Sequence, residues 1–163
     1  MPAYMRRLWQ SGLCPFLVPA VSYEDLMGPR IILKTEGLIH VRDYALSCLD
    51  GIEDSFCLLI EMLASAADGF VQLQRWLADP AFISLDPGDL YYDRERTRSL
   101  LLFRGAEDPR PFGERFCDLC SGLGGSGELI AARLAEICSS RVTQEKGTAA
   151  FLRSWRGQIR SGG

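Results

Sequence analysis

Residues 83 to 103 most constrain the fold, because they hold two short apolar runs separated by a strongly charged segment. The first run, Ile83 to Tyr92, is rich in β-branched, aliphatic and aromatic residues, and it is interrupted by Asp86-Pro87-Gly88-Asp89, a sequence typical of turns. Pro87 disfavours helical geometry in the residue before it, so no helix can run through the segment. Leu100 to Phe103 form the second run, and together the two runs predict a β-hairpin with a solvated tip.

A long helical pattern leads into this hairpin. Its apolar residues recur at spacings of three, four and seven, and they are Phe56, Ile60, Leu63, Ala67, Phe70 and Leu77. The helix should end at Ala78 or Asp79, because Pro80 disfavours helical geometry in the preceding residue. The helix is predicted to be central and buried on more than one side, since its apolar face is broadened by Leu59, Leu73 and Trp76.

Short strands are predicted before this helix and further helices after the hairpin. Residues 1–12 are expected to be a disordered or truncated start. An extended segment at 14–21, a turn at 22–29, a strand at 30–35 and a helix at 38–49 should follow. Later helices are predicted at 112–123, at 128–139 with Leu129, Ile130, Leu134 and Ile137 inward, and from Thr143 onward, burying Phe151, Leu152, Trp155 and Ile159. The expected organisation is one α+β domain over 13–159, with the start of a tail or linker at 160–163.

Composition excludes several classes of protein. A chain of 163 residues with 47% hydrophobic residues is long enough for one domain with its own core. A net charge of −3 argues against a general nucleic-acid partner. The chain has no run of about 20 uninterrupted apolar residues and no secretory leader, so we expect a cytoplasmic protein without direct membrane insertion. Six cysteines in such a protein are expected to be reduced thiols.

The charge is unevenly distributed along the chain. Residues 50–95 hold ten acidic and two basic side chains, whereas residues 141–163 hold five basic and one acidic. These regions are either two solvated faces or a bipolar docking surface. They could pair within one molecule or between two.

Three motifs have a chemical interpretation and a simpler structural one. Residues 122–127 fit the dinucleotide pattern G-x-G-x-x-G, but helical spacing precedes them where that pattern requires a strand, so a turn between helices is favoured. Cys117 and Cys120 form C-x-x-C without the second pair of a zinc site or the setting of a redox motif, so structural cysteines are favoured. His40 has no evident nucleophile beside it. A Ser-His-Asp or Cys-His catalytic set that includes His40 is kept as an alternative.

Asp86, Asp89 and Asp93 form a fourth group of interest. Closely spaced carboxylates can hold Mg²⁺ or act as acid and base, yet aspartate beside proline and glycine is also ordinary turn chemistry. The turn interpretation is favoured, and cofactor or metal binding by these three residues is kept as the alternative.

The order of a long helix, a proline-containing loop, a hairpin and a following glycine resembles a protein kinase. Aligning Pro87 with the kinase pattern H-R-D-L-K-P-E-N puts Phe82, Ile83 and Ser84 at the His, Arg and catalytic Asp positions. Asp86 then replaces the Lys, and Asp89 replaces the metal-binding Asn. Phe103, Arg104 and Gly105 stand where D-F-G would be. The resemblance therefore implies a kinase-like fold that lacks the catalytic base and the main magnesium ligand.

The N-terminal part departs further from the kinase pattern. It contains no glycine-rich phosphate loop, and Lys34 stands too late in the sequence to be the strand lysine that pairs with a helix glutamate. Phosphoryl transfer is therefore not expected, and no catalytic residue or cofactor is assigned.

Within kinase-like folds, the chain is similar to an uncharacterised bacterial domain family that stands N-terminal to forkhead-associated (FHA) phosphopeptide-binding domains. That family shows a "GLLP" stretch, a strand ending near a "tG", and "LDPE-x-I-Y-x-D". The matching segments here are 13–19, 31–37 and 85–93, of which the last is specific, with Gly88 where the family has Glu. The likeness spans about residues 13 to 157, and a type VII secretion pseudokinase subunit is a more distant relative of the same shape.

The resemblance implies a non-catalytic scaffold that binds a protein partner of unknown identity. Its setting would be bacterial phosphorylation-dependent signalling or envelope-associated assembly, and a further domain in a longer chain is expected. The alternative is a degenerate kinase that retains nucleotide or metal binding.

Overall fold

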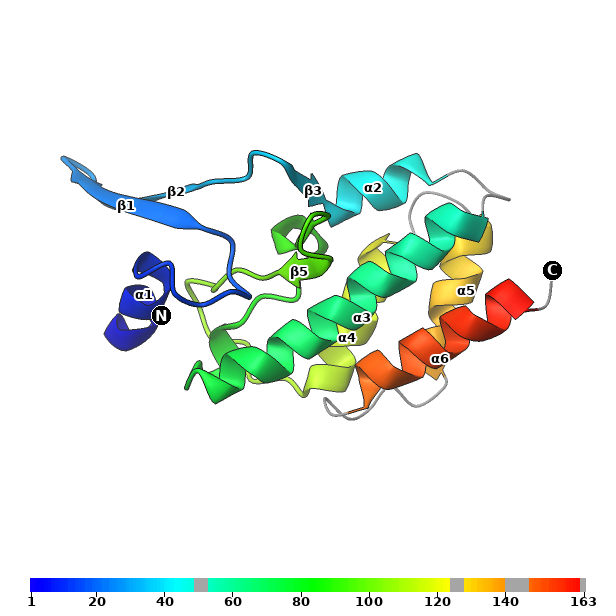
Figure 1. Ribbon diagram of the computed structural model, residues 1–163. Helices are drawn as coiled ribbons and strands as arrows, with labels where there is room; N and C mark the ends of the chain where they lie inside the picture. Colours follow the sequence, from blue (N-terminus) through cyan, green and yellow to red (C-terminus); the bar gives the residue numbers. More distant parts are fainter. Residues whose placement is uncertain (49–52, 124–127, 140–146, 162–163) are drawn as a thin grey trace.

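The computed structural model describes residues 1–48, 53–123, 128–139 and 147–161. Figure 1 shows a two-stranded hairpin with a short helix at one end of the molecule, a small sheet in the middle and a group of helices towards the C-terminus. One cluster of buried apolar side chains runs from the first helix to the last. The fold class is α+β, as the sequence predicts.

The first residues form helix α1 (Ala3–Gln10), so the expectation of a disordered start is wrong. Met5 and Trp9 lie one helical turn apart and are both buried. The indole Nε1 of Trp9 donates a hydrogen bond to the carbonyl oxygen of Val18 at 2.7 Å, and its ring meets Phe103 edge-on. These tertiary contacts stabilise a helix that would be too short to persist alone.

Strands β1 (Ala20–Asp25) and β2 (Gly28–Leu33) form the antiparallel hairpin, with Asp25 opposite Gly28. Gly28 has a φ of 108°, which only glycine adopts readily. The strands run further towards the tip than predicted, because the expected turn over residues 22–29 is confined to Leu26 and Met27. The expected extended segment before them is mostly irregular, with one isolated bridge from Leu17 to Leu101.

The central sheet has the order β3-β4-β5, and its strands are β3 (Leu38–His40), β4 (Tyr91–Asp93) and β5 (Arg98–Leu100), all antiparallel. The helix predicted over 38–49 is therefore wrong at its start, since three of these residues pair with β4 and helix α2 covers only Val41–Ser47. An available strand partner outweighs a helical pattern this short. Leu49 lies outside the described residues.

The hairpin predicted around 83–103 is confirmed, with shorter strands. A turn of 3-10 helix, η2 (Pro87–Asp89), interrupts the first apolar run as Pro87 predicts. Beyond it the pairing resumes at an isolated antiparallel bridge between Ile83 and Phe103. Another 3-10 turn, η1 (Pro80–Phe82), leads into this bridge.

Helix α3 (Glu53–Arg75) is the predicted central helix, and its residues Leu59, Ile60, Leu63 and Leu73 are fully buried. It ends earlier than expected, in a Schellman motif. Ala78 N–H donates to the carbonyl of Leu73 at 3.1 Å, and Leu77 N–H donates to that of Gln74 at 2.9 Å. Trp76 and Leu77 are exposed rather than buried, because both residues follow the last helical turn.

Three more helices complete the lobe: α4 (Phe112–Leu123), α5 (Glu128–Ser139) and α6 (Thr148–Ser161). The first two have the predicted bounds. The apolar residues at helical spacing in α4 are buried, as is Leu134 of α5; those of α4 are Phe112, Phe116, Leu119 and Leu123. Leu152 is buried in α6 as predicted, whereas Phe151 is exposed. The predicted cap Thr143 and tail 162–163 lie outside the described residues, as do the side chains of Leu129, Ile130, Ile137 and Ile159.

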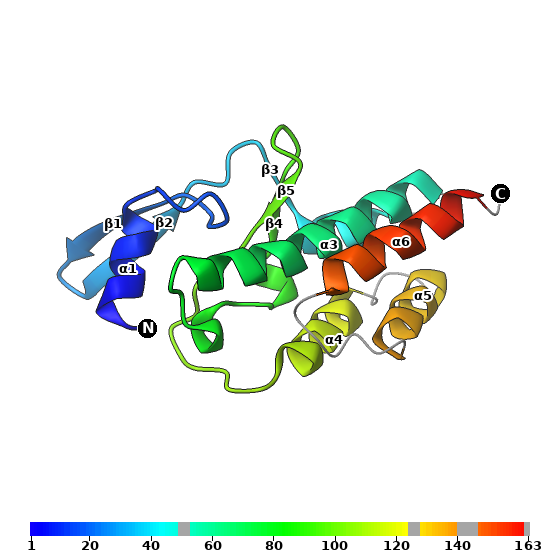
Figure 2. The ribbon, with the colours of Figure 1, turned by 60° about the horizontal axis from the view of Figure 1, so that its bottom comes forward.

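Helix α6 lies along α3, and Figure 2 shows the two side by side. Arg153 reaches Glu61 at 3.1 Å and Asp68 at 2.7 Å, and Arg156 also pairs with Glu61. Part of the uneven charge seen in the sequence is therefore paired within one molecule, between α3 and the basic C-terminal helix.

By length and composition alone, residues 54–75 of α3 would be apolar enough to cross a membrane. Glu61 and Asp68 interrupt the apolar run, so the sequence has no uninterrupted stretch of the length that a membrane span needs. Moreover, 72% of the apolar window is buried inside the protein, as is usual for the core helix of a water-soluble domain.

Candidate functional site

The positions compared with the kinase catalytic loop are occupied by buried side chains. Phe82, Ile83 and Ser84 are each less than a tenth exposed. Their backbone pairs with the stretch compared with D-F-G: Ser84 N–H donates to the carbonyl of Leu102 at 2.8 Å, and Arg104 N–H donates to that of Phe82 at 2.7 Å. The two stretches thus lie side by side, but these three positions present no carboxylate to solvent.

Residues 103–105 have structural contacts of their own. Phe103 is buried against Trp9, with ring centroids 5.8 Å apart. Arg104 Nη1 pairs with Asp108 Oδ2 at 3.0 Å, and the carbonyl of Gly105 accepts a hydrogen bond from the amino group of Met1 at 3.0 Å. All three residues hold neighbouring segments together.

Asp86 and Asp89 make separate local hydrogen bonds. Asp86 Oδ1 accepts from Gly88 N–H at 2.8 Å and so caps η2. Asp89 Oδ2 accepts from the hydroxyl of Ser84 at 2.6 Å. This is the turn chemistry that the sequence favours.

Asp93 is buried at the end of β4, where its carboxylate binds Arg96. The backbone N–H and the guanidinium of Arg96 donate to it at 3.0 and 2.8 Å. Burial alone would raise the pKa of Asp93, but these hydrogen bonds outweigh it and leave that pKa lowered. Within the described ranges, no three His, Cys, Asp or Glu side chains are arranged to hold a metal ion.

His40 has both ring nitrogens engaged. Its Nε2 lies 3.0 Å from the carbonyl oxygen of Gly88, and its Nδ1 lies 3.1 Å from Asp43 Oδ2. The His–Asp half of a catalytic set is thus present, but the nitrogen that would activate a nucleophile is occupied by a backbone carbonyl.

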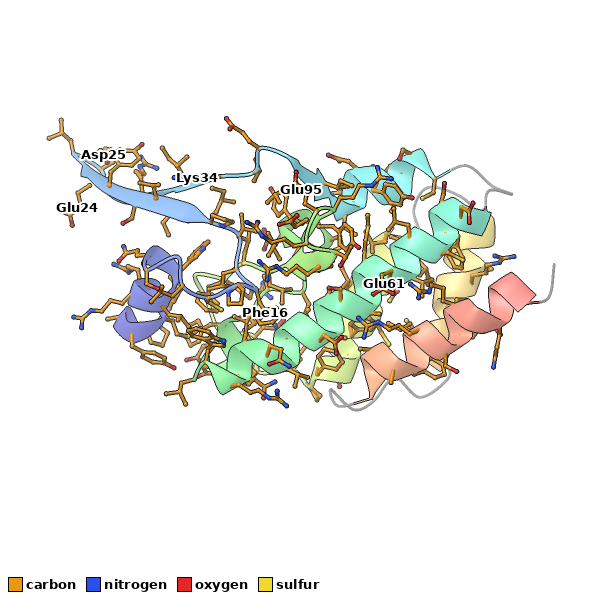
Figure 3. All side chains as sticks on the ribbon, in the orientation of Figure 1. Phe16, Glu24, Asp25, Lys34, Glu61 and Glu95 are labelled. Atoms are coloured by element: carbon orange, nitrogen blue, oxygen red, sulfur yellow. The ribbon has the colours of Figure 1, made fainter. Side chains whose placement is uncertain are left out.

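Lys34 lies on the exposed β1–β2 hairpin, whereas Glu61 lies on α3, as the labelled side chains in Figure 3 show. Among the residues that the structure describes, Lys34 makes no ion pair, and Glu61 is paired with Arg153 and Arg156. The two residues therefore do not form a lysine–glutamate pair of the kind that anchors ATP phosphates in kinases.

An ionic cluster that the sequence did not reveal is centred on the buried carboxylate of Asp108, in the segment between β5 and α4. Its carboxylate is less than a tenth exposed and pairs with Arg104, Arg110 and Arg115. A hydrogen bond from Arg110 is the main cause that lowers the pKa of Asp108 to about 2. Arg115 is also buried, and it donates to the carbonyls of Pro80, at 2.9 Å, and Ile83. The cluster therefore fixes the backbone that enters the central hairpin.

Beside this cluster lies a cavity of about 210 Å³. Its charged lining residues are Arg104, Arg110, Arg115, Asp86, Asp108 and Asp118. Three positive and three negative side chains leave no excess positive charge to attract a phosphate. Gly122 also faces this region from α4, where an added Cβ would lie 2.5 Å from Cγ of Pro87.

That close approach explains Gly122 without a dinucleotide. The residue is in the last turn of α4, so a helix precedes the glycines as the turn interpretation requires. Residues 124–127 of the motif lie outside the described residues.

Cys117 and Cys120 lie on α4 and meet a third thiol, Cys138 of α5. Cys138 is within hydrogen-bonding reach of both thiols, and its Sγ lies 3.9 Å from the carbonyl oxygen of Cys117. The sequence singled out only the C-x-x-C pair, because no local spacing links residue 138 to it.

The β1–β2 hairpin exposes large apolar side chains on one face and at its tip. Val21 and Ile32 are opposite each other in the register and, with Tyr23, lie on the same face; Leu26 and Met27 form the tip. Ile32 is 55% exposed and Met27 is 83% exposed. We call these five residues the hairpin surface. Strand alternation could have suggested one such face, but not that it stays uncovered.

No model of a protein family matches the chain, and no curated protein matches its sequence. The likeness to the FHA-associated family and to pseudokinases therefore stays a prediction based on the segments quoted above.

Proposed function

We propose that this domain is a non-catalytic protein-interaction module that docks an extended, uncharged, apolar segment of another protein on the hairpin surface. The observation that carries the proposal is the exposure of five large apolar residues on a protruding two-stranded sheet. Folded domains seldom leave such residues together on the surface unless they contact a partner.

The geometry of the hairpin favours an extended segment as the occupant. Helix α1 packs beside β1, where Gln10 Nε2 donates to the Ser22 hydroxyl at 2.6 Å. Strand β2, like β1, is an outer strand of this two-stranded sheet. An outer strand has unpaired backbone donors and acceptors, which another strand satisfies by adding to the edge.

The charge of the hairpin favours an uncharged occupant. Residues 20–34 hold two acidic side chains, Glu24 and Asp25, and two basic ones, Arg30 and Lys34. Arg30 and Asp25 already pair with each other at 3.0 Å. The hairpin therefore has no net charge, and apolar contact and backbone pairing supply the affinity.

The absence of catalysis is supported by the buried residues at the compared kinase positions and by the balanced charge of the neighbouring cavity. We place the module in the cytoplasm of a bacterium, in phosphorylation-dependent signalling linked to FHA domains or in envelope-associated assembly, because the resemblance of residues 85–93 implies that setting.

The docking site is tested by adding a capped hexapeptide of alternating threonine and valine to the full chain. The readout is the change in the chemical shift of each backbone amide. We expect the peptide to change the chemical shifts mainly over Gly28–Leu33. The same peptide should cause no such changes in the variant Ile32→Asp. Leu46 of α2 provides a matched control, because it is also 55% exposed; Leu46→Asp should bind as the unmodified chain does. Shifts confined to the helices, or none at millimolar peptide, would overturn the docking site.

The molecular mass in solution shows whether the hairpin surface binds a second copy of this chain instead of a segment of another protein. A dimer that Ile32→Asp dissociates and Leu46→Asp does not would replace the foreign segment by a second copy. A monomer is the expected result.

The non-catalytic assignment is tested by thermal unfolding with millimolar ATP and either Mg²⁺ or Mn²⁺. A ligand at about 100 times its Kd stabilises the folded state by roughly 2.7 kcal/mol, which raises Tm by several degrees at this size. We expect no shift. A metal-dependent shift would establish the degenerate-kinase alternative, and Asp86, Asp89 and Asp93 would be the first residues to substitute.

A further inference from the structure

Three cysteine thiols meet between α4 and α5, apart from the hairpin surface. Cys117 and Cys120 project from α4, and Cys138 of α5 lies within hydrogen-bonding reach of both. Over the described parts of the chain, no group of His, Cys, Asp or Glu is arranged to hold a metal ion. Cys138 Sγ lies 3.9 Å from the carbonyl oxygen of Cys117, and two cysteines on neighbouring helices can be joined by a disulfide.

The three thiols differ in exposure. Cys120 is fully buried, whereas Cys117 and Cys138 are partly exposed. These two also line a surface cavity of about 520 Å³ together with Arg110, Glu114 and Asp118. A small molecule in solvent can therefore reach Cys117 and Cys138 but not Cys120.

We propose that Cys117 and Cys138 are a redox-sensitive dithiol that a hydroperoxide oxidises to a disulfide joining α4 to α5. Cys120 is a positioning residue, because its buried thiol donates a hydrogen bond to Cys138 without contacting the oxidant.

The first step uses the thiolate of Cys138. It attacks the distal oxygen of the hydroperoxide, so an S–O bond forms, the O–O bond breaks, and the departing alkoxide or hydroxide takes a proton. The sulfur is oxidised by two electrons to a sulfenic acid, and the hydroperoxide is reduced to an alcohol or water.

In the second step the thiol of Cys117 attacks the sulfenic sulfur. The S–S bond forms, the S–O bond breaks, and hydroxide leaves with the proton of Cys117 as water. Overall, two thiols and one hydroperoxide give one disulfide, one water and one alcohol or second water.

The surroundings determine which sulfur reacts first. Hydrogen bonds from Cys120 and Cys117 lower the pKa of Cys138 to about 6, against burial and the charge of Asp118, which act to raise it. Burial and the hydrogen bond to Cys138 raise the pKa of Cys117 to about 11. Of the other charged groups at the cavity, Glu114 is acidic, and Arg110 already pairs with Asp108 and Asp118. Cys138 is therefore the thiolate near neutral pH, and Cys117 is the resolving thiol.

The test oxidises the full chain with hydrogen peroxide near pH 7, blocks the remaining thiols with an alkylating reagent and maps the linked peptides by mass. We expect a Cys117–Cys138 link, the loss of two free thiols and full reversal by dithiothreitol. The oxidised form should unfold at a Tm on the order of 5 °C higher, since the link closes a loop in the unfolded chain.

Variants separate the roles of the three cysteines. In Cys117→Ser, dimedone should trap the sulfenic acid on Cys138, and no link should form. In Cys120→Ala the link should still form, but the pH at which oxidation reaches half its maximal rate should rise from near 6, because alanine cannot donate a hydrogen bond to Cys138. Cys57→Ser is the control, because Cys57 is buried in α3, and it should behave as the unmodified chain.

Two results would overturn the proposal. One is a link between Cys117 and Cys120, or between two molecules, in place of the Cys117–Cys138 link. The other is oxidation of Cys138 no faster than that of Cys57 in the same chain, which serves as an internal reference in protein whose folding has been verified by its Tm.

Discussion

The β1–β2 hairpin and the helical lobe use the same kinds of side chain differently. In the lobe, Ile60 and Leu63 of α3 are fully buried, whereas Ile31 and Ile32 of β2 are exposed. An isoleucine in α3 removes apolar surface from water when the chain folds, and one in β2 largely does not. The lobe therefore supplies the stability of the domain, and the hairpin retains apolar residues that folding does not require.

Charged groups differ in the same way. Arg30 and Asp25 pair on the hairpin in contact with solvent, while Arg115 and Asp108 pair with each other inside the protein. An exposed pair contributes little to stability, but a buried charge must keep its partners. Substitutions in the two regions should thus have effects of different size.

The largest effect is expected from Arg115→Met. The substitution leaves the carbonyls of Pro80 and Ile83 without this donor and removes the guanidinium from over the Phe70 ring. We expect a loss of about 3 to 5 kcal/mol of unfolding free energy in urea denaturation. Arg75→Met, at the exposed end of α3, is the control and should cost less than about 0.5 kcal/mol. A loss below about 1 kcal/mol for Arg115→Met would show that the cluster does not hold this backbone.

Acid should destabilise the lobe through Asp108, which is the next effect in size. Its pKa is about 2 in the folded protein, below the ordinary value of 3.8, so folding favours its ionised form. Its contribution is complete above about pH 4 and is lost as the pH falls towards 2. Urea midpoints measured across this window should fall less steeply in Asp108→Asn than in the unmodified chain. Parallel curves for the two proteins would contradict the assignment, and Asp25→Asn on the hairpin serves as the control.

A smaller effect, of opposite sign, is expected at the end of α3. Leu77 has a φ of 61° and is 80% exposed, so it adopts a backbone conformation suited to glycine and loses little burial on substitution. Leu77→Gly should raise the unfolding free energy by about 1 kcal/mol. Leu77→Ala should bring no such gain, because alanine keeps the Cβ that causes the strain. Equal effects of the two substitutions would argue against strain at this position.

The smallest effect is expected on the hairpin surface. The cross-strand pair Val21 and Ile32 replaced together by threonine keeps β-branched side chains on a solvated face. The unfolding free energy should change by less than about 0.5 kcal/mol. Leu63→Ala in α3, by contrast, should cost about 2 to 5 kcal/mol. A loss above about 2 kcal/mol for the hairpin pair would mean that this face contributes to the core.

Periodicity and turn residues predicted the elements whose structure depends on nearby sequence. Helices α3 and α4 have long apolar patterns, and Pro87 sets the interruption of the central hairpin within its own neighbourhood. Helix α1 was missed because its stability comes from Trp9 contacting Phe103, although the spacing of Met5 and Trp9 was a signal. Strand β3 was missed because its partner β4 lies about fifty residues away.

The candidate sites also divide into features set by nearby residues and features set by contacts between distant segments. The local hydrogen bonds of Asp86 and Asp89 could be predicted, since their partners are within five residues. The Asp108–Arg115 cluster and the meeting of Cys138 with Cys117 depend on how α4 packs, which no local pattern records. The apolar composition of β1 and β2 was visible, but their exposure depends on which elements fail to cover them.

The packing of α6 along α3 has a consequence for biosynthesis. Helix α3 ends at Arg75, and α6 begins 73 residues later, at Thr148. At about 5 to 20 residues per second, a ribosome needs on the order of 4 to 15 seconds to synthesise that distance. During this interval a nascent helix with the composition of a membrane span has not yet received its last cover. The newly made chain is therefore most exposed to aggregation, and to capture by chaperones or the membrane-insertion machinery, before translation reaches α6.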